Sequence, residues 1–120
     1  MSQASNKLGN WGEQRAAEYL KQLGYTIVTS NFRYGHGEID LVAEHDGMLV
    51  FVEVKTQSSD AMGEAFNWVT RRKQRQIGRV ALAYLTANNI VNHDCRFDVI
   101  AVARRGDEVE IKHLPNAFWL

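Results

Sequence analysis

Apolar and polar positions follow two helical patterns and several strand patterns along the chain. Residues 11–23 repeat apolar side chains at helical spacing and end before Gly24, which predicts a first helix. A second, longer helical pattern covers about residues 64–88. Between and after these helices, runs of strand-forming residues predict strands at 25–32, 37–44, 49–55, 95–102 and 109–114.

The strands at 37–44 and 49–55 are joined by a strong hairpin signal. Asp46-Gly47 favours a two-residue turn in which both residues take positive φ angles. With this turn, His45 lies opposite Met48. Counting outward, Asp40 faces Glu53 and Glu38 faces Lys55.

The predicted hairpin gathers charge on one of its faces. Alternation places Glu38 and Asp40 on one side of the first strand, with Ile39, Leu41 and Ala43 on the other. Glu53 and Lys55 share a face of the second strand. Acids this close repel, and a hard divalent cation such as Mg²⁺, which prefers carboxylate oxygens, would remove that cost. The alternative is a solvated face with an ordinary Lys55–Glu38 ion pair.

The first helix carries one acid in an unexpected place. Glu13 falls within the apolar stripe formed by Ala16, Ala17, Leu20 and Leu23. A carboxylate on the core-facing side is costly unless a partner satisfies it. Glu13 therefore either reaches the acidic hairpin or is a first-turn acid that favours the helix N-terminus.

The second helix has a basic side. Its apolar side chains are Ile77, Val80, Ala81 and Tyr84. The opposite side carries a stripe of four arginines: Arg71, Arg72, Arg75 and Arg79. Such a stripe can hold several phosphates of a nucleic acid, and the alternative is a solvated helix face.

Three further features leave alternatives open. His36, in a glycine-rich turn before the hairpin, either contacts a phosphate or is solvated. Arg96 and Asp98 share a face of their strand and form either an extension of the site or a structural ion pair at a sheet edge. The apolar C-terminal tail, residues 116–120, packs on the domain or on a second subunit, because an exposed tail of this kind would be adhesive.

Composition limits the possible classes of protein. A length of 120 residues predicts one domain, residues 1–120, and 45% hydrophobic residues argue against disorder. Because the formal net charge is zero, nucleic-acid binding needs a local patch.

The single Cys95 fits a reducing cytoplasm. Residues 1–10 lack a signal-peptide core, and no apolar run is long enough to span a membrane. Zinc-ligand spacing, phosphate-binding loops and serine-nucleophile motifs are absent.

The ordered set Glu13, Asp40 and Glu53-Val54-Lys55 resembles the PD-(D/E)XK nuclease superfamily, although Ile39 rather than proline precedes Asp40. The two hairpin strands are also similar to those of archaeal Holliday-junction resolvases. The chain is closer still to the YraN-like family of uncharacterised bacterial proteins, and this match covers nearly its whole length. It extends through residues 72–74, 96–99 and 116–118.

The superfamily resemblance implies a fold and a division of roles. The fold is α/β with a restriction-endonuclease-like core, in which helices flank a mixed central sheet containing the antiparallel acidic hairpin. Asp40 and Glu53 would bind Mg²⁺, with Mn²⁺ as a substitute and the carbonyl of Val54 as a further ligand. Lys55 would orient or deprotonate the attacking water, and Glu13 would assist.

The expected function is that of a Mg²⁺-dependent endonuclease that hydrolyses DNA phosphodiesters, including branched or repair intermediates. A homodimer would let two sites address two strands. The alternatives are a nucleic-acid-binding module without catalysis and a protein-interaction domain on the same fold. No membrane partner is expected.

Overall fold

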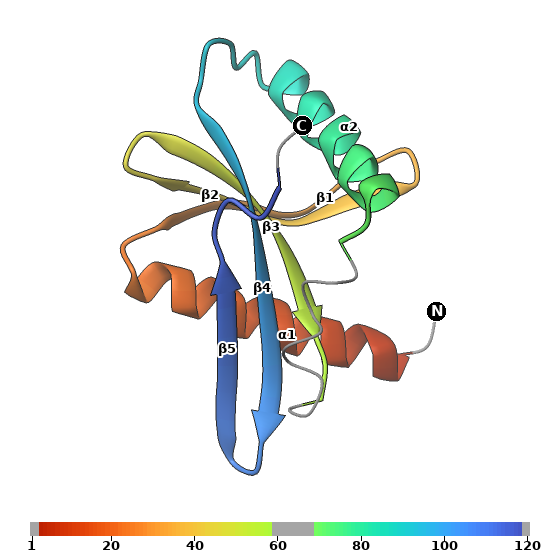
Figure 1. The fold of residues 1–120 in the computed structure, drawn as a ribbon, viewed down its shortest axis with the longest axis vertical. Coiled ribbons are helices and arrows are strands. Elements are labelled where there is room, and N and C mark those ends of the chain that lie inside the picture. Colours follow the sequence, from red (N-terminus) through yellow and green to blue (C-terminus); the bar gives the residue numbers. More distant parts are fainter. Residues whose placement is uncertain (1–2, 59–68, 119–120) are drawn as a thin grey trace.

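The computed structural model describes residues 3–58 and 69–118, which form one five-stranded sheet and two helices (Figure 1). The elements are α1 (Gln3–Gln22), β1 (Thr26–Tyr34), β2 (Gly37–His45), β3 (Met48–Thr56), α2 (Arg71–Ala87), β4 (Cys95–Arg105) and β5 (Glu108–Leu114). The strand order is β1-β2-β3-β4-β5, with β3 and β4 parallel and the other neighbours antiparallel. This confirms the expected mixed sheet with flanking helices.

The β2–β3 hairpin has the predicted turn. Asp46 and Gly47 both have positive φ angles, 51° and 77°, as a two-residue turn of this type requires. His45 pairs with Met48, and the ladder continues to the pair Leu41 and Val52. The expected register is therefore confirmed along this part of the hairpin.

The outer end of the hairpin differs from the prediction. The β2–β3 ladder ends at Leu41 and Val52, whereas β2 remains paired with β1 as far as Gly37. The predicted pairs Asp40–Glu53 and Glu38–Lys55 are consequently not ladder partners. The predicted alternation also fails here: Ile39 packs in the core beside α2, but Leu41 packs in the core beside α1. This change of face occurs where β2 separates from β3 and continues beside β1 alone.

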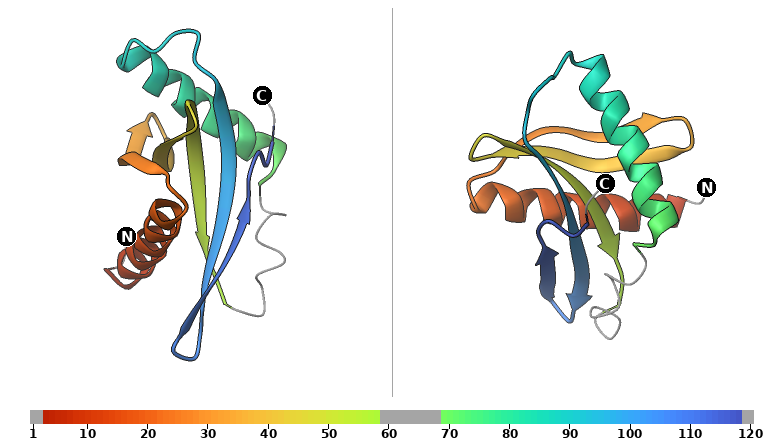
Figure 2. Two further views of the ribbon diagram at one scale, coloured as in Figure 1. Left: turned by 90° about the vertical axis from the view of Figure 1, so that its left-hand side faces the viewer. Right: turned by 45° about the horizontal axis from the view of Figure 1, so that its top comes forward.

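One core layer lies between α1 and the sheet, and the left view of Figure 2 shows α1 on one side of β3, β4 and β5. Ala16 and Leu20 are fully buried here, as predicted, but Leu23 follows the last residue of the helix and is half exposed. Helix and strand approach closely at Gly12, because a Cβ atom there would overlap Oγ1 of Thr56. This contact fixes the position of the next residue, Glu13.

The second core layer lies beneath α2. As predicted, its buried side chains are Ile77, Val80, Ala81 and Tyr84. The helix begins later than expected. Thr70 has extended backbone angles and accepts a hydrogen bond from the Lys73 N–H, so it is the N-cap. Residues 69–70 are thus not helical, and the predicted helical residues 64–68 lie outside the described part of the chain.

The chain after β5 returns to the core layer of α2, where Phe118 is buried. Ala117 donates its N–H to the carbonyl of Phe97, and the ring of Phe118 stacks on Phe97 with centroids 5.0 Å apart. As far as Phe118, the tail therefore packs on its own domain, which is one of the two expected arrangements. Trp119 and Leu120 lie outside the described residues.

Arg96 and Asp98 form a structural network on the α1 side of the sheet. Asp98 is 1% exposed and accepts hydrogen bonds from Arg96 at 2.8 and 3.0 Å, with further bonds to His113 and the Asn116 N–H. The ion pair is confirmed, but the predicted position at a sheet edge is wrong, since β4 lies between β3 and β5.

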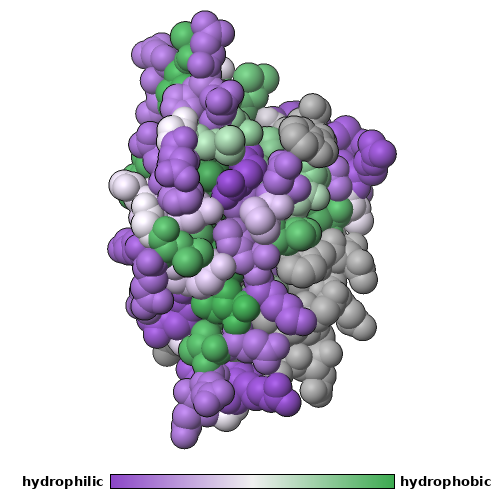
Figure 3. Space-filling view, turned by 60° about the vertical axis from the view of Figure 1, so that its left-hand side comes forward, coloured by the Kyte–Doolittle hydropathy of each residue, from purple (hydrophilic) through white to green (hydrophobic). Residues whose placement is uncertain are grey.

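The face of the molecule in Figure 3 is largely hydrophilic, and its hydrophobic side chains form small separate patches. Isolated exposed hydrophobic residues of this kind are ordinary on folded proteins. Among the residues that the structure describes, no helix combines the length and apolar character needed to cross a membrane.

Candidate functional site

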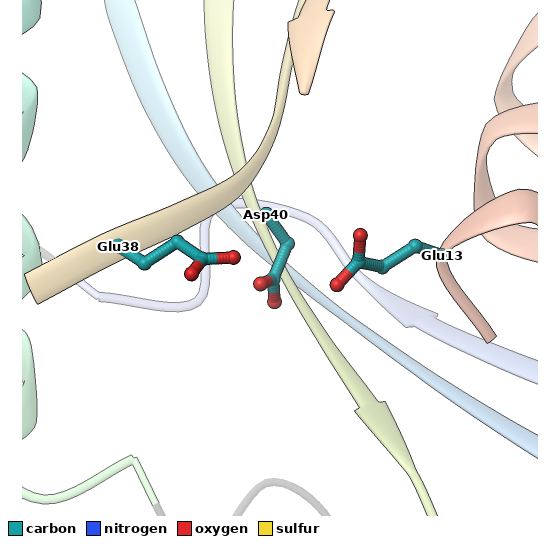
Figure 4. Close-up of side chains that lie close together, drawn as sticks. All are labelled: Glu13, Glu38 and Asp40. Carbon is teal, nitrogen blue, oxygen red and sulfur yellow. The ribbon is translucent and has the colours of Figure 1, made fainter. Parts of the chain in front are cut away.

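Three carboxylates converge where α1 faces the diverging end of β2. One oxygen from each of Glu13, Glu38 and Asp40 lies within 4.8 Å of the others. Figure 4 shows Glu13 reaching from α1 on one side, Glu38 from β2 on the other, and Asp40 between them. The structure thus favours the interpretation that Glu13 reaches the acidic hairpin.

Asn31 holds two of these acids in place. Its side-chain amide donates hydrogen bonds of 2.8 Å to Glu13 and of 2.8 Å to Glu38. Arg33 also donates to Glu38, at 2.9 Å. Sequence analysis missed Asn31, whose backbone has a positive φ of 54°. Asparagine tolerates that conformation better than most residues, but the sequence contains no signal that links it to the two acids.

Asp40 fills the space left where β2 separates from β3. Its Oδ2 accepts a 2.8 Å hydrogen bond from the backbone N–H of Val54. Leu49 donates its own N–H to Asp94 beside β4. Since N–H groups alternate along a strand, that of Val54 points to the opposite side, toward β2. The carboxylate therefore replaces a missing ladder partner.

Glu53 is the most unusual acid of the site. Its side chain is only 7% exposed. Oε2 lies 3.8 Å from Nζ of Lys73 on α2, whereas the buried Oε1 has no hydrogen-bond partner among the described residues. Burying a carboxylate without full compensation is costly, so the Glu53 carboxylate favours binding of a proton or a cation.

The pKa values of three acids of the site are raised, which also favours binding of a proton or a cation. Burial raises the pKa of Glu53 to about 9, and repulsion from Asp40 adds to the effect. Burial likewise raises the pKa of Asp40 to about 7, although the hydrogen bond from Val54 opposes it. The pKa of Glu13 is also raised by burial, against the hydrogen bond from Asn31. A bound cation would offset this crowding of negative charge.

Glu38, Asp40 and Glu53 line one open pocket of about 360 Å³, which we call the acidic pocket, and Glu13 lies just outside its lining. Asp40 and Glu53 both contribute to its wall, so they do not project to opposite surfaces. Lys55 and Val54 of the predicted motif line it as well. His36 is also part of the wall, and its backbone carbonyl accepts a hydrogen bond from Gln76.

Two wall residues come from α2 and were not expected in the site. Lys73 and Gln76 line the acidic pocket, and Lys73 forms an ion pair with Glu53. The helical pattern could not identify them, because their role depends on where α2 docks against β2 and β3. Gly37 sets that docking, since a Cβ atom on it would lie 2.6 Å from Cγ2 of Val80.

The four predicted arginines are all exposed, but they are not equivalent. Arg72 and Arg79 line a second pocket that adjoins the acidic one, whereas Arg71 and Arg75 do not. The structure therefore divides the arginine stripe into two residues that face the neighbouring pocket and two that do not.

The donor set is suited to a hard divalent cation. Carboxylate oxygens from Asp40 and Glu53 are the ligand type that Mg²⁺ prefers, and the open pocket leaves space for its waters. Within residues 3–58 and 69–118, Oε1 of Glu53 has no hydrogen-bond partner, which gives a specific reason for a cation at this point. Glu13 and Glu38 lie next to Asp40 and could bind metal-coordinated water.

The family model for the uncharacterised protein family UPF0102 matches residues 12–102. The chain belongs to UPF0102. This family is the YraN-like group that the sequence resembles. The matched segment begins at Gly12, directly before Glu13, and ends within β4. It therefore includes every acid of the pocket.

Curated relatives show the same membership over nearly the full length. A UPF0102 protein of Syntrophotalea carbinolica is 50% identical over 111 residues, covering 92% of this chain and 90% of the relative. One of Trichlorobacter lovleyi is 47% identical and covers 100% of this chain and 96% of the relative. One of Clostridium acetobutylicum is 39% identical, with 100% of both chains covered.

Proposed function

We propose that this UPF0102 protein is a Mg²⁺-dependent endonuclease that hydrolyses DNA phosphodiesters, with a restriction-endonuclease-like core of the PD-(D/E)XK type. The observation that carries the proposal is the state of Glu53. Its carboxylate is buried, with one oxygen that has no hydrogen-bond partner in the described part of the chain, and it lies in the same pocket as Asp40 and Lys55. A structural acid would be expected to have its hydrogen bonds satisfied, whereas a metal ligand has an oxygen available for an ion.

The resemblance implies the roles of the residues, and the shared pocket of Asp40, Glu53, Val54 and Lys55 supports them. Asp40 and Glu53 would hold the metal, with the carbonyl of Val54 as a further ligand. When bound, Mg²⁺ or Mn²⁺ would lower the pKa of a water molecule and stabilise charge on the phosphate. Lys55 lines the same wall and would orient or deprotonate the attacking water. Glu13 would hold a water molecule from the side of α1.

The exposed arginines of α2 supply the positive charge that a neutral chain needs to bind DNA. Arg71, Arg72, Arg75 and Arg79 would contact phosphates, which makes binding salt-dependent. We place this activity in the cytoplasm, and a homodimer would present two acidic pockets to two strands.

A metal titration on matched proteins tests the proposal. Mg²⁺ and Mn²⁺ are titrated against branched, flapped, single-stranded and duplex DNA with wild type and Asp40→Asn. We expect wild-type cleavage and at least about a 100-fold loss in Asp40→Asn, with DNA affinity in chelator nearly unchanged. Asparagine keeps an acceptor for the Val54 N–H, so the fold is preserved.

Asp46→Asn is the control, because it makes the same chemical change on an exposed hairpin turn and should cleave like wild type. Equal cleavage by carefully purified Asp40→Asn and wild type would refute the assignment of the site. DNA binding without cleavage by wild type, at every metal concentration, would instead favour a binding module on this fold.

A further inference from the structure

A second pocket of about 500 Å³ adjoins the acidic pocket. The two share His36, Gly37 and Gln76. We name the second one the arginine pocket, and its distinguishing residues are Tyr34, Gly35, Arg72 and Arg79. It lies between the β1–β2 turn and α2, so a chain that leaves the acidic pocket along α2 enters it directly.

The arginine pocket continues into a groove of about 470 Å³ that is mainly apolar. The two share Tyr34 and Arg79. We name it the apolar groove, and its further lining includes Phe32, Leu82 and Ala83. Tyr34 is 58% exposed and Leu82 is 64% exposed, so the groove presents an aromatic ring and an aliphatic side chain to solvent.

Acidic side chains are confined to one end of this path. The acidic pocket contains Glu38, Asp40 and Glu53 together with Lys55 and Lys73, whereas no acidic residue is among the described lining of the arginine pocket or the apolar groove. Arg72 and Arg79 form no ion pair with any residue in the ranges 3–58 and 69–118. Both guanidinium groups therefore face a space suited to an anion.

Arg72 and Arg79 lie on the same side of α2 and line the same pocket. Arg72 and Arg79 are two helical turns apart, about 10 Å along the axis at a rise of 1.5 Å per residue. The fixed order is acidic pocket, arginine pocket, apolar groove. A phosphate next to one at the acidic pocket would meet the arginines, and the attached base would meet Tyr34 and the apolar groove.

We propose that the arginine pocket and the apolar groove bind one unpaired nucleotide of DNA next to the phosphodiester at the acidic pocket. Arg72 and Arg79 hold its phosphate, and its base stacks on Tyr34 over the groove. This inference rests on the proposed nuclease function and names its substrate class: DNA with an unpaired base beside the cleaved bond, such as a flap, a bulge or a frayed junction.

A nucleotide explains both halves of the path better than other occupants. Continuous duplex offers its phosphate backbone to a helix surface and keeps its bases stacked, so it would leave the apolar groove unused. An apolar peptide or a second copy of the chain would not require two unpaired guanidinium groups. A base has an apolar face for an exposed aromatic ring, and its backbone carries the charge that arginine recognises.

Binding in chelator, where no cleavage occurs, tests the inference. The probes are a 20-base-pair duplex and the same duplex with one bulged 5-iododeoxyuridine. We expect tighter binding of the bulged DNA by about 5- to 100-fold, and photocrosslinking of the bulged base to Tyr34 detected by mass spectrometry. Tyr34→Leu should abolish the crosslink and most of the preference, and Tyr34→Phe should retain both.

The arginines provide matched charge controls on one helix. Arg72→Ala and Arg79→Ala should reduce the preference for the bulge, whereas Arg75→Ala should weaken both DNAs by a similar, smaller factor. Equal binding of bulged and continuous DNA, or equal loss of preference from all three substitutions, would overturn the inference. So would a dimer that Leu82→Ser dissociates, since the groove would then hold a second copy.

The outcome is separable from that of the proposed function. Selective binding and crosslinking without Mg²⁺-dependent cleavage would support the nucleotide site and refute the proposed nuclease function. Cleavage without preference for an unpaired base would leave the nuclease standing and refute the nucleotide site.

Discussion

The carboxylate of Asp40 accepts a hydrogen bond from the backbone N–H of Val54, 2.8 Å long. This bond links the first acid of the candidate metal site to the residue that follows the second, Glu53. It also satisfies a backbone donor at the point where β2 leaves β3. Asp40 therefore stabilises the strand separation that opens the acidic pocket, in addition to its proposed role as a ligand.

The metal-free protein should lose stability as pH rises. The folded-state pKa values of Asp40, about 7, and Glu53, about 9, lie above the ordinary values, so the folded state binds more protons than the unfolded chain. Their contribution is complete below about pH 4 and is lost as pH rises through about 7 and then about 9. Each pH unit costs up to about 1.4 kcal/mol per titrating group. Thermal unfolding in chelator at a series of pH values measures this loss of stability.

Asp40→Asn isolates the source of this pH dependence. The variant should be more stable than wild type at about pH 8 in chelator and nearly equal to it at about pH 4, because it removes one buried charge and keeps an acceptor for Val54. Mg²⁺ should stabilise wild type more than the variant. Parallel pH profiles of the two proteins would contradict the electrostatic account.

Lys73→Gln should tighten metal binding. Nζ of Lys73 lies 3.8 Å from Oε2 of Glu53 and supplies positive charge that competes with a cation. Removing it should lower the Mg²⁺ or Mn²⁺ concentration for half-saturation by about threefold to tenfold. Isothermal titration calorimetry at fixed pH measures the change. Arg105→Gln, at the exposed end of β4 and outside the lining of the pocket, is the control, and an equal response in both variants would show a nonspecific charge effect.

Gly12→Ala should destabilise the fold. The added Cβ would overlap Oγ1 of Thr56, so α1 must shift away from β3, at a cost of about 1–3 kcal/mol. Chemical denaturation measures the loss. The double variant Gly12→Ala/Thr56→Ala should recover most of it relative to Thr56→Ala alone, because the overlapping oxygen is gone. Additive losses would show that Gly12 serves another purpose.

Asp98→Asn should be a stability variant rather than a site variant. Burial opposes the charge of Asp98, but hydrogen bonds with His113, Arg96 and Asn116 outweigh it and hold the pKa of Asp98 below its usual value. Breaking this network should cost about 3–5 kcal/mol of unfolding free energy. In wild type, the contribution of Asp98 should disappear as pH falls through its lowered folded-state pKa. Metal affinity measured below the unfolding temperature should not change.

Local chemistry explains what the sequence predicted well. Asp46 and Gly47 specify a tight turn, and counting outward from it gives the correct pairing up to Leu41 and Val52. The buried side of α2 follows from helical periodicity alone. Glu13 stood out because an acid lay within an apolar stripe, and the structure places it beside Asp40.

The parts that were missed depend on packing between distant segments. Nothing near Leu41 in the sequence shows that β2 follows β1 rather than β3 beyond that point, so the faces of Ile39 and Leu41 were assigned wrongly. Lys73 and Asn31 enter the site only because α2 and β1 dock around it. Asp98 was assigned to a sheet edge because the parallel pairing of β4 with β3, on its other side from β5, could not be read from the sequence.

The parallel pairing of β3 with β4 has a kinetic consequence. Leu49 meets Cys95, so the central ladder joins strands separated by the whole of α2 and the segment before it. Loop closure over such a separation is slow compared with zipping a hairpin. We therefore expect the β1–β2–β3 meander to form early during refolding, and Glu53 to acquire its neighbour Lys73 only later, when α2 and β4 dock.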